Sequence, residues 1–283
     1  MADNYLERKY QEYQSQKSSA TKSGYGKKKT TPIHKMRRVF VTGGADGIGK
    51  TIVKAFRMAG HRVAFCDWNE ESGKETAEKT GTTFYHVDIN NKEALENCMH
   101  HILEDWGDLD IIINNAGISK FASLTETSVE DFDQTLSANL RPAFITSRLL
   151  AIHRQSQTTP NSYGRIINIS STHYPTNRLS CEAYAASRSG ICSLTQTLAM
   201  SLSPCHTTVN SIIPGWIQAD DYDQIDPEAH PIPFSGRMGK PEDITRICLF
   251  LCQEENDFIN GENITIDGGT TRTPMTIIEK QQL

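Results

Sequence analysis

Residues 39–49 read Val-Phe-Val-Thr-Gly-Gly-Ala-Asp-Gly-Ile-Gly, an apolar run that passes directly into a glycine-rich turn, and a helical pattern follows to Met58. A chain that turns sharply off a strand and approaches a phosphate with its backbone needs glycine, because side chains obstruct both. The free N–H groups at the start of the helix then attract anions. This stretch therefore predicts a dinucleotide-binding turn with cofactor contacts at Gly43, Asp46, Gly47, Ile48 and Gly49.

Short apolar runs alternate with longer amphipathic stretches through the rest of the chain. The apolar runs cover residues 39–41, 63–65, 111–113, 166–169, 209–213 and 264–266, with a weaker candidate at 83–87. Helical patterns between them include 49–58, 92–106, 129–150 and 183–202. Repeated strand–helix–strand units imply right-handed crossovers and a parallel sheet covered on both faces. The fold class is thus α/β, a single doubly wound, Rossmann-like parallel sheet, and we place this domain at residues 37–270.

Composition limits the class of protein further. Residues 1–38 carry 10 Lys/Arg against 3 Asp/Glu, and the remainder carries 19 against 31, so a +7 leader precedes a body of −12. We expect residues 1–36 to form a flexible basic extension, with docking onto an acidic neighbouring subunit as the alternative, and 271–283 to form a tail. A net charge of −5 argues against nucleic-acid binding. The chain has no membrane-length apolar run, no secretory h-region and no metal-binding cysteine spacing, so we expect a cytoplasmic protein without a metal.

Five motifs, in order, resemble the short-chain dehydrogenase/reductase family. They are Thr42-Gly43-x-x-x-Gly47-x-Gly49, Asn114-Asn115-Ala116-Gly117, Pro214-Gly215-Trp216-Ile217, the segment 236–244 and Asp267-Gly268-Gly269. Each motif is modestly specific, and their order and spacing together are much more so. The resemblance implies an NAD(P)-dependent oxidoreductase, with further cofactor contacts at Asn115, Ala116, Gly117, Pro214, Gly215 and Ile217.

The acidic side chains near the turn favour NAD(H) over NADP(H). Asp67 ends the second strand about 20 residues beyond the glycines, where a carboxylate can accept hydrogen bonds from ribose hydroxyls. A 2′-phosphate there would meet a like charge. Asp46 and Trp68 occupy positions where NADP-preferring relatives often carry a basic residue. Asp88, at the end of the third strand, resembles the carboxylate that contacts the adenine amino group.

The candidate catalytic residues follow the fifth strand. Ser171 precedes Tyr184 by thirteen residues, the spacing seen in the family, and Ser170 is the alternative if the loop is one residue longer. A tyrosine with its ordinary pKa of about 10 is a poor base, so it needs a nearby cation to favour the phenolate. The resemblance makes Tyr184 the acid/base, Ser171 the partner of the substrate oxygen and Asn139 the anchor of a proton relay.

Position 188 departs from the family pattern, because Arg188 stands where the family has lysine. Arginine can still supply positive charge and bind the nicotinamide ribose, but it carries protons poorly. Replacement by lysine should then preserve or raise turnover. The leading interpretation is an enzyme that moves hydride between NAD(H) and a small alcohol or carbonyl compound. The alternative is a non-catalytic NAD(H)-binding or scaffolding protein on the same fold.

Substrate specificity should come from loops at the carboxyl ends of the strands, at 173–181 and 218–235. His173 and Trp216 are candidates to line the substrate pocket beside Ser171 and Tyr184, although such residues often only pack a loop. The helices at 129–150 and 183–202 resemble those through which this family forms dimers and tetramers. We therefore expect a homo-tetramer or a dimer.

Overall fold

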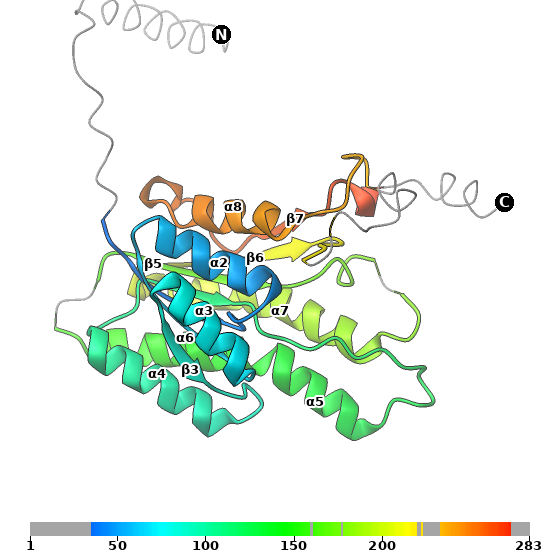
Figure 1. The fold of residues 1–283 in the computed structure, drawn as a ribbon, viewed down its shortest axis with the longest axis horizontal. Coiled ribbons are helices and arrows are strands. Elements are labelled where there is room, and N and C mark those ends of the chain that lie inside the picture. Colours follow the sequence, from blue (N-terminus) through cyan, green and yellow to red (C-terminus); the bar gives the residue numbers. More distant parts are fainter. Residues whose placement is uncertain (1–34, 159–160, 177, 220–221, 223–232, 273–283) are drawn as a thin grey trace, which may run out of the picture. The chain divides into compact units, whose positions relative to one another are not determined.

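The computed structural model describes residues 35–158, 161–176, 178–219, 222 and 233–272. The basic leader, the C-terminal tail from residue 273 and most of the 218–235 loop lie outside these residues. The described chain contains one seven-stranded parallel sheet in the order β3-β2-β1-β4-β5-β6-β7 (Figure 1). This confirms the predicted doubly wound α/β fold. The strands are β1 (Arg38–Thr42), β2 (Arg62–Asp67), β3 (Thr83–His86), β4 (Ile111–Asn114), β5 (Gly164–Ile169), β6 (Thr207–Pro214) and β7 (Asn263–Ile266).

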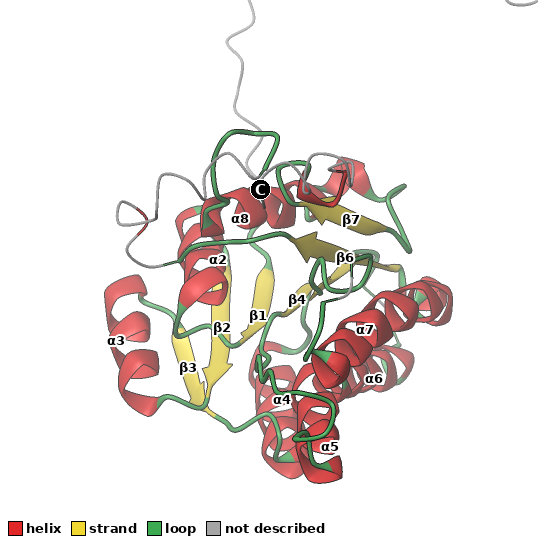
Figure 2. Ribbon diagram, turned by 90° about the vertical axis from the view of Figure 1, so that its right-hand side faces the viewer, coloured by secondary structure: helices red, strands yellow, loops and turns green. Residues whose placement is uncertain are grey.

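Helices connect the strands and cover both faces of the sheet. On one face lie α2 and α8, with α3 beside them, and on the other lie α4, α5, α6 and α7 (Figure 2). Their bounds are α2 (Gly47–Met58), α3 (Glu70–Thr80), α4 (Lys92–Trp106), α5 (Val129–Asn139), α6 (Arg141–Gln155), α7 (Glu182–Ser201) and α8 (Pro241–Leu251).

The expected single helix at 129–150 is wrong, because the chain breaks at Leu140 into α5 and α6. Pro142 lies in the first turn of α6. Proline has no N–H to donate to the carbonyl four residues earlier, and its ring crowds that carbonyl, so a continuous helix is disfavoured there. The break places Asn139 at the end of α5, next to the loop that follows β4.

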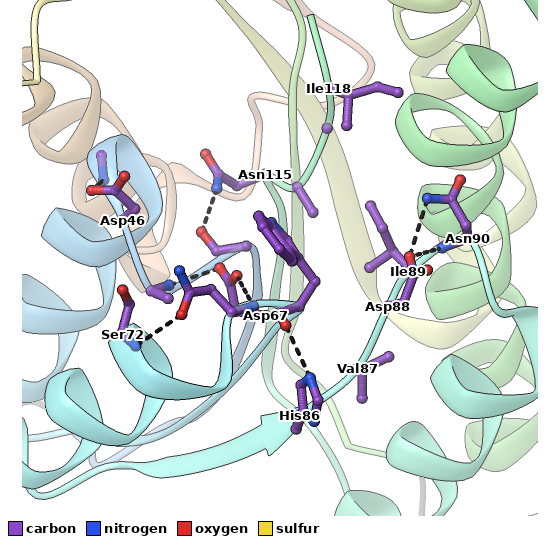
Figure 3. A pocket seen from close by; sticks show the side chains of 17 residues that line it. Asp46, Asp67, Ser72, His86, Val87, Asp88, Ile89, Asn90, Asn115 and Ile118 are labelled. Carbon is purple, nitrogen blue, oxygen red and sulfur yellow. Dashed lines mark hydrogen bonds between the residues drawn. The ribbon is translucent and has the colours of Figure 1, made fainter. Parts of the chain in front are cut away.

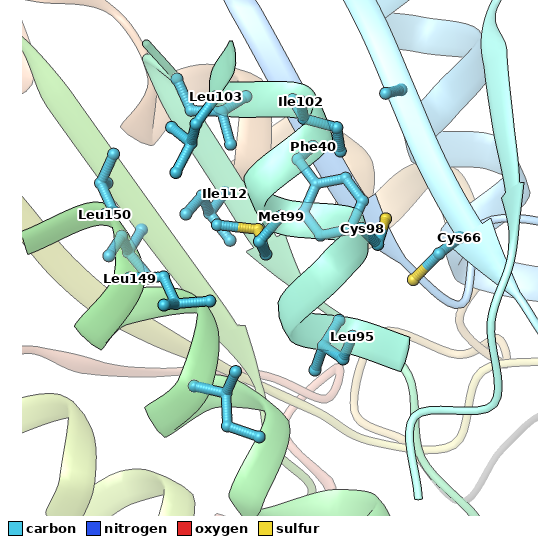
Figure 4. Packing of buried hydrophobic residues seen from close by; sticks show 14 of the residues in the cluster. Phe40, Cys66, Leu95, Cys98, Met99, Ile102, Leu103, Ile112, Leu149 and Leu150 are labelled. Carbon is cyan, nitrogen blue, oxygen red and sulfur yellow. The ribbon is translucent and has the colours of Figure 1, made fainter. Parts of the chain in front are cut away.

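Alternation along each strand divides the core into two layers. Val39 and Val41 of β1 pack with Ile52 and Phe56 of α2, whereas Phe40 faces the opposite side of the sheet. There it joins a cluster that includes Leu95, Cys98, Met99 and Ile102 of α4 and Leu149 and Leu150 of α6 (Figure 4). Burial on both faces is what the continuous apolar strands predict, and it fixes the strand ends against which the site is built.

The two edges of the sheet differ in chemistry. At the amino ends of the strands, Arg154 is completely buried and paired with Asp108, with Nε 3.2 Å from the Asp108 Oδ1 oxygen. Its guanidinium also donates to the Leu109 carbonyl at 2.6 Å and to the Thr207 hydroxyl at 2.9 Å. This charged network ties α6 to the beginnings of β4 and β6. The network thus stabilises the amino ends of the strands, whereas the predicted site lies at their carboxyl ends.

At the carboxyl ends, the chain leaves β1 and β4 in opposite directions. β1 lies between β2 and β4, with Thr42 level with Cys66 on one side and Asn114 on the other. Such a switch in strand order opens a crevice in which doubly wound folds bind ligands. Within the described chain, none of the helices combines the length and the apolar character required to cross a lipid bilayer.

Candidate active site

The glycine turn has the geometry that its sequence predicts. Gly43 and Gly47 adopt φ angles of +68° and +54°, a region that favours glycine. A β-carbon at Gly49 would lie 1.8 Å from the Gly43 carbonyl oxygen, so no larger residue fits the first turn of α2. Asp46 caps this helix, with its carboxylate accepting from the Gly47 N–H at 2.7 Å. The turn thus brings backbone N–H groups and the helix N-terminus to the crevice.

The loop after β4 is locked onto this turn by hydrogen bonds. The Thr42 hydroxyl oxygen accepts from the backbone N–H groups of Asn115 and Ala116, both at 3.1 Å. The Asn115 amide donates to the Gly43 carbonyl at 2.9 Å. A β-carbon at Gly43 would lie 2.8 Å from the Ala116 Cα, so the two loops touch through their backbones. Sequence reasoning treated these as separate cofactor motifs, and the structure joins them.

A cavity of about 670 Å³ opens beside the two loops (Figure 3). Asp67 lies in its wall, where its carboxylate accepts from the Ala45 and Asn69 N–H groups, both at 3.0 Å. Asp46 and Asp88 also line the cavity, whereas none of its described lining residues is lysine or arginine. The further lining residues are Gly43, Ala45, Gly47, Trp68, Asn69, Ser72, His86, Val87, Ile89, Asn90, Asn115, Ala116, Gly117 and Ile118.

These residues fit a dinucleotide. The cavity extends from Asp88 past the glycine turn to Gly117 and Ile118. A β-carbon at Gly43 or Gly49 would collide with neighbouring backbone, so glycine keeps this turn compact where a pyrophosphate would approach the N-terminus of α2. Asp67 offers acceptor oxygens to ribose hydroxyls.

Gly117 connects this cavity to the candidate catalytic residues. A β-carbon there would lie 2.5 Å from Arg188 Nη2 and 2.8 Å from Asn139 Oδ1. The Arg188 guanidinium is buried, with its Nη1 donating to the Ile169 carbonyl of β5 at 3.0 Å and its carbon 5.0 Å from the Tyr184 ring centroid. Among the described residues, its buried Nε donor has no hydrogen-bond partner. Arg188 therefore places a positive charge between the end of the cavity and Tyr184.

Tyr184, on the first turn of α7, is 8% exposed. Burial alone would raise the pKa of its phenol, but the Arg188 charge and hydrogen bonding from Ser171, Arg188 and Ser119 together bring that pKa below its ordinary value of 10.0. The pKa of the Tyr184 phenol is therefore closer to neutral pH than that of a free tyrosine, as an acid/base group requires.

The structure also separates the two candidate serines. The Ser171 hydroxyl interacts with Tyr184 and lies 3.1 Å from His173 Nδ1. Ser170 is turned away, and its hydroxyl donates to the Arg188 carbonyl at 2.9 Å. The aromatic ring of His173 meets Tyr184 edge-on at 5.2 Å between centroids and stacks on Phe121 at 6.0 Å. Ser171, His173, Tyr184 and Phe121 form one cluster, which we call the tyrosine cluster.

Asn139 is engaged entirely with the protein. Its side-chain oxygen accepts from the Ile118 N–H at 2.7 Å, and its amide nitrogen donates to the Ile118 carbonyl and the Ser187 hydroxyl, both at 3.0 Å. The side chain thus fastens the loop after β4 to α7, beside Tyr184. A water-holding role for Asn139 stays a prediction.

The loop after β6 carries the remaining predicted residues. The Pro214 carbonyl accepts from the Thr172 N–H at 3.1 Å, which joins this loop to the one that bears Ser171 and His173. A β-carbon at Gly215 would lie 2.7 Å from the Asp267 Cα. Trp216 is exposed and, with Ile217, lines a separate hollow of about 280 Å³. Among the described residues, the ring contacts of the tyrosine cluster do not include Trp216.

Sequence reasoning missed a buried polar chain beneath the site. The Thr146 hydroxyl donates to the side-chain oxygen Oδ1 of Asn114 at 2.8 Å, and the Asn114 side-chain amide donates to Asn168 Oδ1 at 2.8 Å. The Asn168 side-chain amide donates to the Thr195 hydroxyl at 2.9 Å. The chain links α6, β4, β5 and α7. Polar residues at the ends of two buried apolar strands were the one sequence signal for it.

Comparison with known proteins places this geometry in a family. The family described as "Enoyl-(Acyl carrier protein) reductase", a group of short-chain dehydrogenases/reductases, matches residues 43–271. The chain belongs to the short-chain dehydrogenase/reductase family. It is 34% identical over 248 residues to an uncharacterized oxidoreductase of Thermotoga maritima, covering 82% of this chain and 94% of that protein.

Two solved structures are similar to this short-chain dehydrogenase/reductase. An apo SCOR enzyme from Clostridium thermocellum superimposes with a TM-score of 0.76 at 36% identity, covering 84% of this chain and 94% of that one. ElxO with NADP bound gives 0.75 at 26% identity, covering 84% and 100%. The fold, the glycine turn and the oxidoreductase class are thus shared features of a family that binds nicotinamide cofactors.

Proposed function

We propose that the chain is an NAD(H)-dependent enzyme that interconverts a small alcohol and its ketone or aldehyde, with Tyr184 as the acid/base. The observation that carries the proposal is the buried Tyr184 phenol, whose pKa is lowered beside the Arg188 guanidinium at the end of the dinucleotide-shaped cavity. A packing tyrosine has no need of an adjacent buried cation or of a hydroxyl partner.

Each residue of the tyrosine cluster has a role in this proposal. When bound, the nicotinamide cofactor donates or accepts the hydride. Tyr184 gives its proton to the substrate oxygen in reduction and removes the hydroxyl proton in oxidation. Ser171 donates a hydrogen bond to that oxygen and stabilises its developing negative charge. Arg188 supports the phenolate and holds a donor, Nε, for a ribose hydroxyl.

The proposed preference for NAD(H) rests on the charges of the cavity wall. Asp46, Asp67 and Asp88 line it, and its described lining lacks a lysine or arginine that could compensate a 2′-phosphate. A related structure contains NADP, so family membership leaves the choice open. His173, in contact with Tyr184, and Trp216, on the loop after β6, remain our candidates for the substrate side of the pocket.

We further propose a cytoplasmic homo-tetramer or dimer. Large apolar side chains are exposed along α5, α6 and α7, namely Val129, Phe132, Phe144, Ile152 and Met200. A second subunit would remove this apolar surface from water. Sedimentation at the mass of one 31.6 kDa chain would overturn this part of the proposal.

The deciding experiment follows NADH formation and consumption at 340 nm over a panel of small alcohols, sugar alcohols and carbonyl compounds, with wild type and Tyr184→Phe in parallel. We expect turnover by wild type and loss of turnover by the variant, with NADH binding retained. Absence of wild-type turnover in both directions with intact NADH binding would favour the alternative, a non-catalytic NAD(H)-binding or scaffolding protein. The guanidinium at position 188 is the feature that favours that alternative.

A further inference from the structure

The proposed reaction consumes or releases one proton at Tyr184 in each turnover, and this proton must exchange with solvent. The phenol is buried, so the exchange needs a carrier. Arg188 cannot serve, because a guanidinium does not release its proton in a protein. The Asn139 side chain is committed to Ile118 and Ser187. Neither Arg188 nor the Asn139 side chain therefore carries the proton away from Tyr184. The carrier must be sought among the other neighbours of Tyr184.

The Ser171 hydroxyl provides the first step away from Tyr184. Its oxygen accepts from the His173 backbone N–H at 3.3 Å. Its single proton serves one acceptor at a time, the phenolate or the substrate oxygen during hydride transfer and His173 Nδ1 afterwards. His173 Nδ1 lies 3.1 Å from this oxygen, and Tyr184 interacts with the same hydroxyl. Ser171 thus stands between the phenol and an imidazole, within hydrogen-bond distance of the imidazole nitrogen.

The environment of His173 suits a proton carrier. The ring is partly exposed and is held between Phe121 and Tyr184. Partial burial and the positive charges of Arg178 and Arg188 lower the pKa of the imidazole below its ordinary value of 6.5. Among the described residues, Arg178, Arg188 and the Tyr184 phenol are the charged and titratable groups beside it. At neutral pH the ring is uncharged and offers one nitrogen as an acceptor and the other as a donor.

We propose that His173 relays the catalytic proton between Ser171 and solvent and so replaces the proton-carrying function that Arg188 cannot perform. The inference rests on the proposed function. In oxidation, the alcohol proton passes to the Tyr184 phenolate. Once the product carbonyl has formed and the Ser171 hydroxyl no longer donates to it, the Tyr184 proton moves to Ser171 Oγ as the Ser171 proton moves to His173 Nδ1. The imidazolium then releases its Nε2 proton to water, and exchange with water returns the ring to the tautomer that accepts at Nδ1. One proton reaches solvent, no electrons move along the relay, and reduction reverses each step.

The principal test is His173→Asn, because an asparagine amide can still hydrogen-bond Ser171 but cannot carry a proton. We expect kcat to fall about tenfold or more, with the KM for NADH changed less than twofold. Added imidazole and other small buffers should restore the rate in proportion to their concentration. His101→Asn, on the exposed face of α4, is the matched control and should retain wild-type kcat.

Two outcomes would overturn the relay: a His173→Asn enzyme with wild-type kcat, or a loss of rate that no small buffer restores. If the asparagine variant does not fold, His173→Gln is measured in the same way. The Arg188→Lys background gives a second test, because an ammonium can exchange protons itself. There, His173→Asn should lower kcat less than threefold, and an undiminished loss would contradict the relay.

The hydrogen bond can also be tested without turnover. Nitrogen-15 NMR of the protein without cofactor should show a His173 ring that titrates below pH 6.5 and whose Nδ1 shift changes in Ser171→Ala. An unchanged shift would overturn the Ser171–His173 contact. If wild type and Tyr184→Phe behave as proposed and His173→Asn matches wild type, only the relay fails. If wild type never turns over, the proposed function fails instead.

Discussion

A β-carbon at Gly117 would lie 2.5 Å from Nη2 of Arg188, although the two residues are far apart in sequence. Gly117 does not adopt a positive φ, so its requirement for glycine is one of space and not of backbone conformation. The glycine of the Asn-Asn-Ala-Gly motif therefore makes room for the guanidinium. Any side chain there would displace Arg188 or the hydrogen-bonded Asn139.

Gly117→Ala should lower kcat/KM about tenfold or more, because a displacement of Arg188 and Asn139 misplaces groups beside Tyr184. Gly60→Ala is the matched control. Gly60 has a φ of +87° and open space around it, so alanine there should cost stability without changing kcat. Steady-state kinetics and urea unfolding separate the two effects, and equal kinetic losses in both variants would refute the steric argument.

Arg188→Lys should preserve or raise turnover, because lysine retains the positive charge and also exchanges protons. Arg188→Met should lower kcat about 100-fold, since it removes the charge that favours the Tyr184 phenolate. Both are measured at saturating NAD and substrate. A large loss in the lysine variant would indicate a site rebuilt around the guanidinium, and the proposed role of Arg188 as a simple cation would be wrong.

The pH profile should follow the Tyr184 phenol, whose pKa lies below 10.0 because Arg188 and the hydroxyl partners outweigh burial. Oxidation needs the phenolate, so its kcat/KM should rise as pH increases through this pKa. Reduction needs the protonated phenol, so its kcat/KM should fall over the same range. Arg188→Met leaves burial dominant and should move both limbs to higher pH. Identical profiles in wild type and Arg188→Met would contradict this assignment.

Cofactor choice should depend on Asp67, whose carboxylate lines the cavity and is fixed by two backbone N–H groups. Asp67→Ser with Trp68→Arg removes a negative charge and adds a positive one. The ratio of the NADPH and NADH dissociation constants, measured by cofactor fluorescence, should change at least tenfold, about 1.4 kcal/mol, toward NADPH. Asp133→Ser, on the exposed surface of α5, should leave the ratio unchanged. Tighter binding of NADPH than of NADH by wild type would refute the proposed preference.

Stability should depend strongly on Arg154 at the opposite edge of the sheet. Arg154→Met removes the buried partner of the Asp108 carboxylate, which keeps only the part-exposed Arg38 at 3.4 Å and the Asn161 amide at 3.0 Å. We expect a loss of about 3 kcal/mol of unfolding free energy. Lys79→Met breaks the exposed ion pair with Glu75 and should change the unfolding free energy far less, because solvent screens that pair. Urea unfolding measures both, and similar losses would show that burial of the Arg154 pair adds little.

Local sequence patterns were sufficient to predict the fold, because the burial of alternate strand residues and the conformation of a tight turn are both set within short segments. Alternation in β1 assigns Val39 and Val41 to one core layer and Phe40 to the other. The glycines of the turn follow from the positive φ of Gly43 and Gly47 and from the contact of Gly49 with the Gly43 carbonyl. The helix break at Leu140 was missed because the apolar pattern continues through it, although Pro142 marks its place.

The sequence by itself thus determined the parallel α/β domain, the dinucleotide turn and the identities of Tyr184, Ser171 and Arg188 as candidates. Only the tertiary structure decided which groups touch them. The register that sets Asn114 level with Asn168 creates the buried polar chain, and the loop after Ser171 turns His173 back onto that hydroxyl. Both hydrogen bonds depend on the exact placement of side-chain atoms, by the register of distant strands in one case and by the path of a loop in the other, and hydrophobic periodicity and motif spacing do not specify that placement.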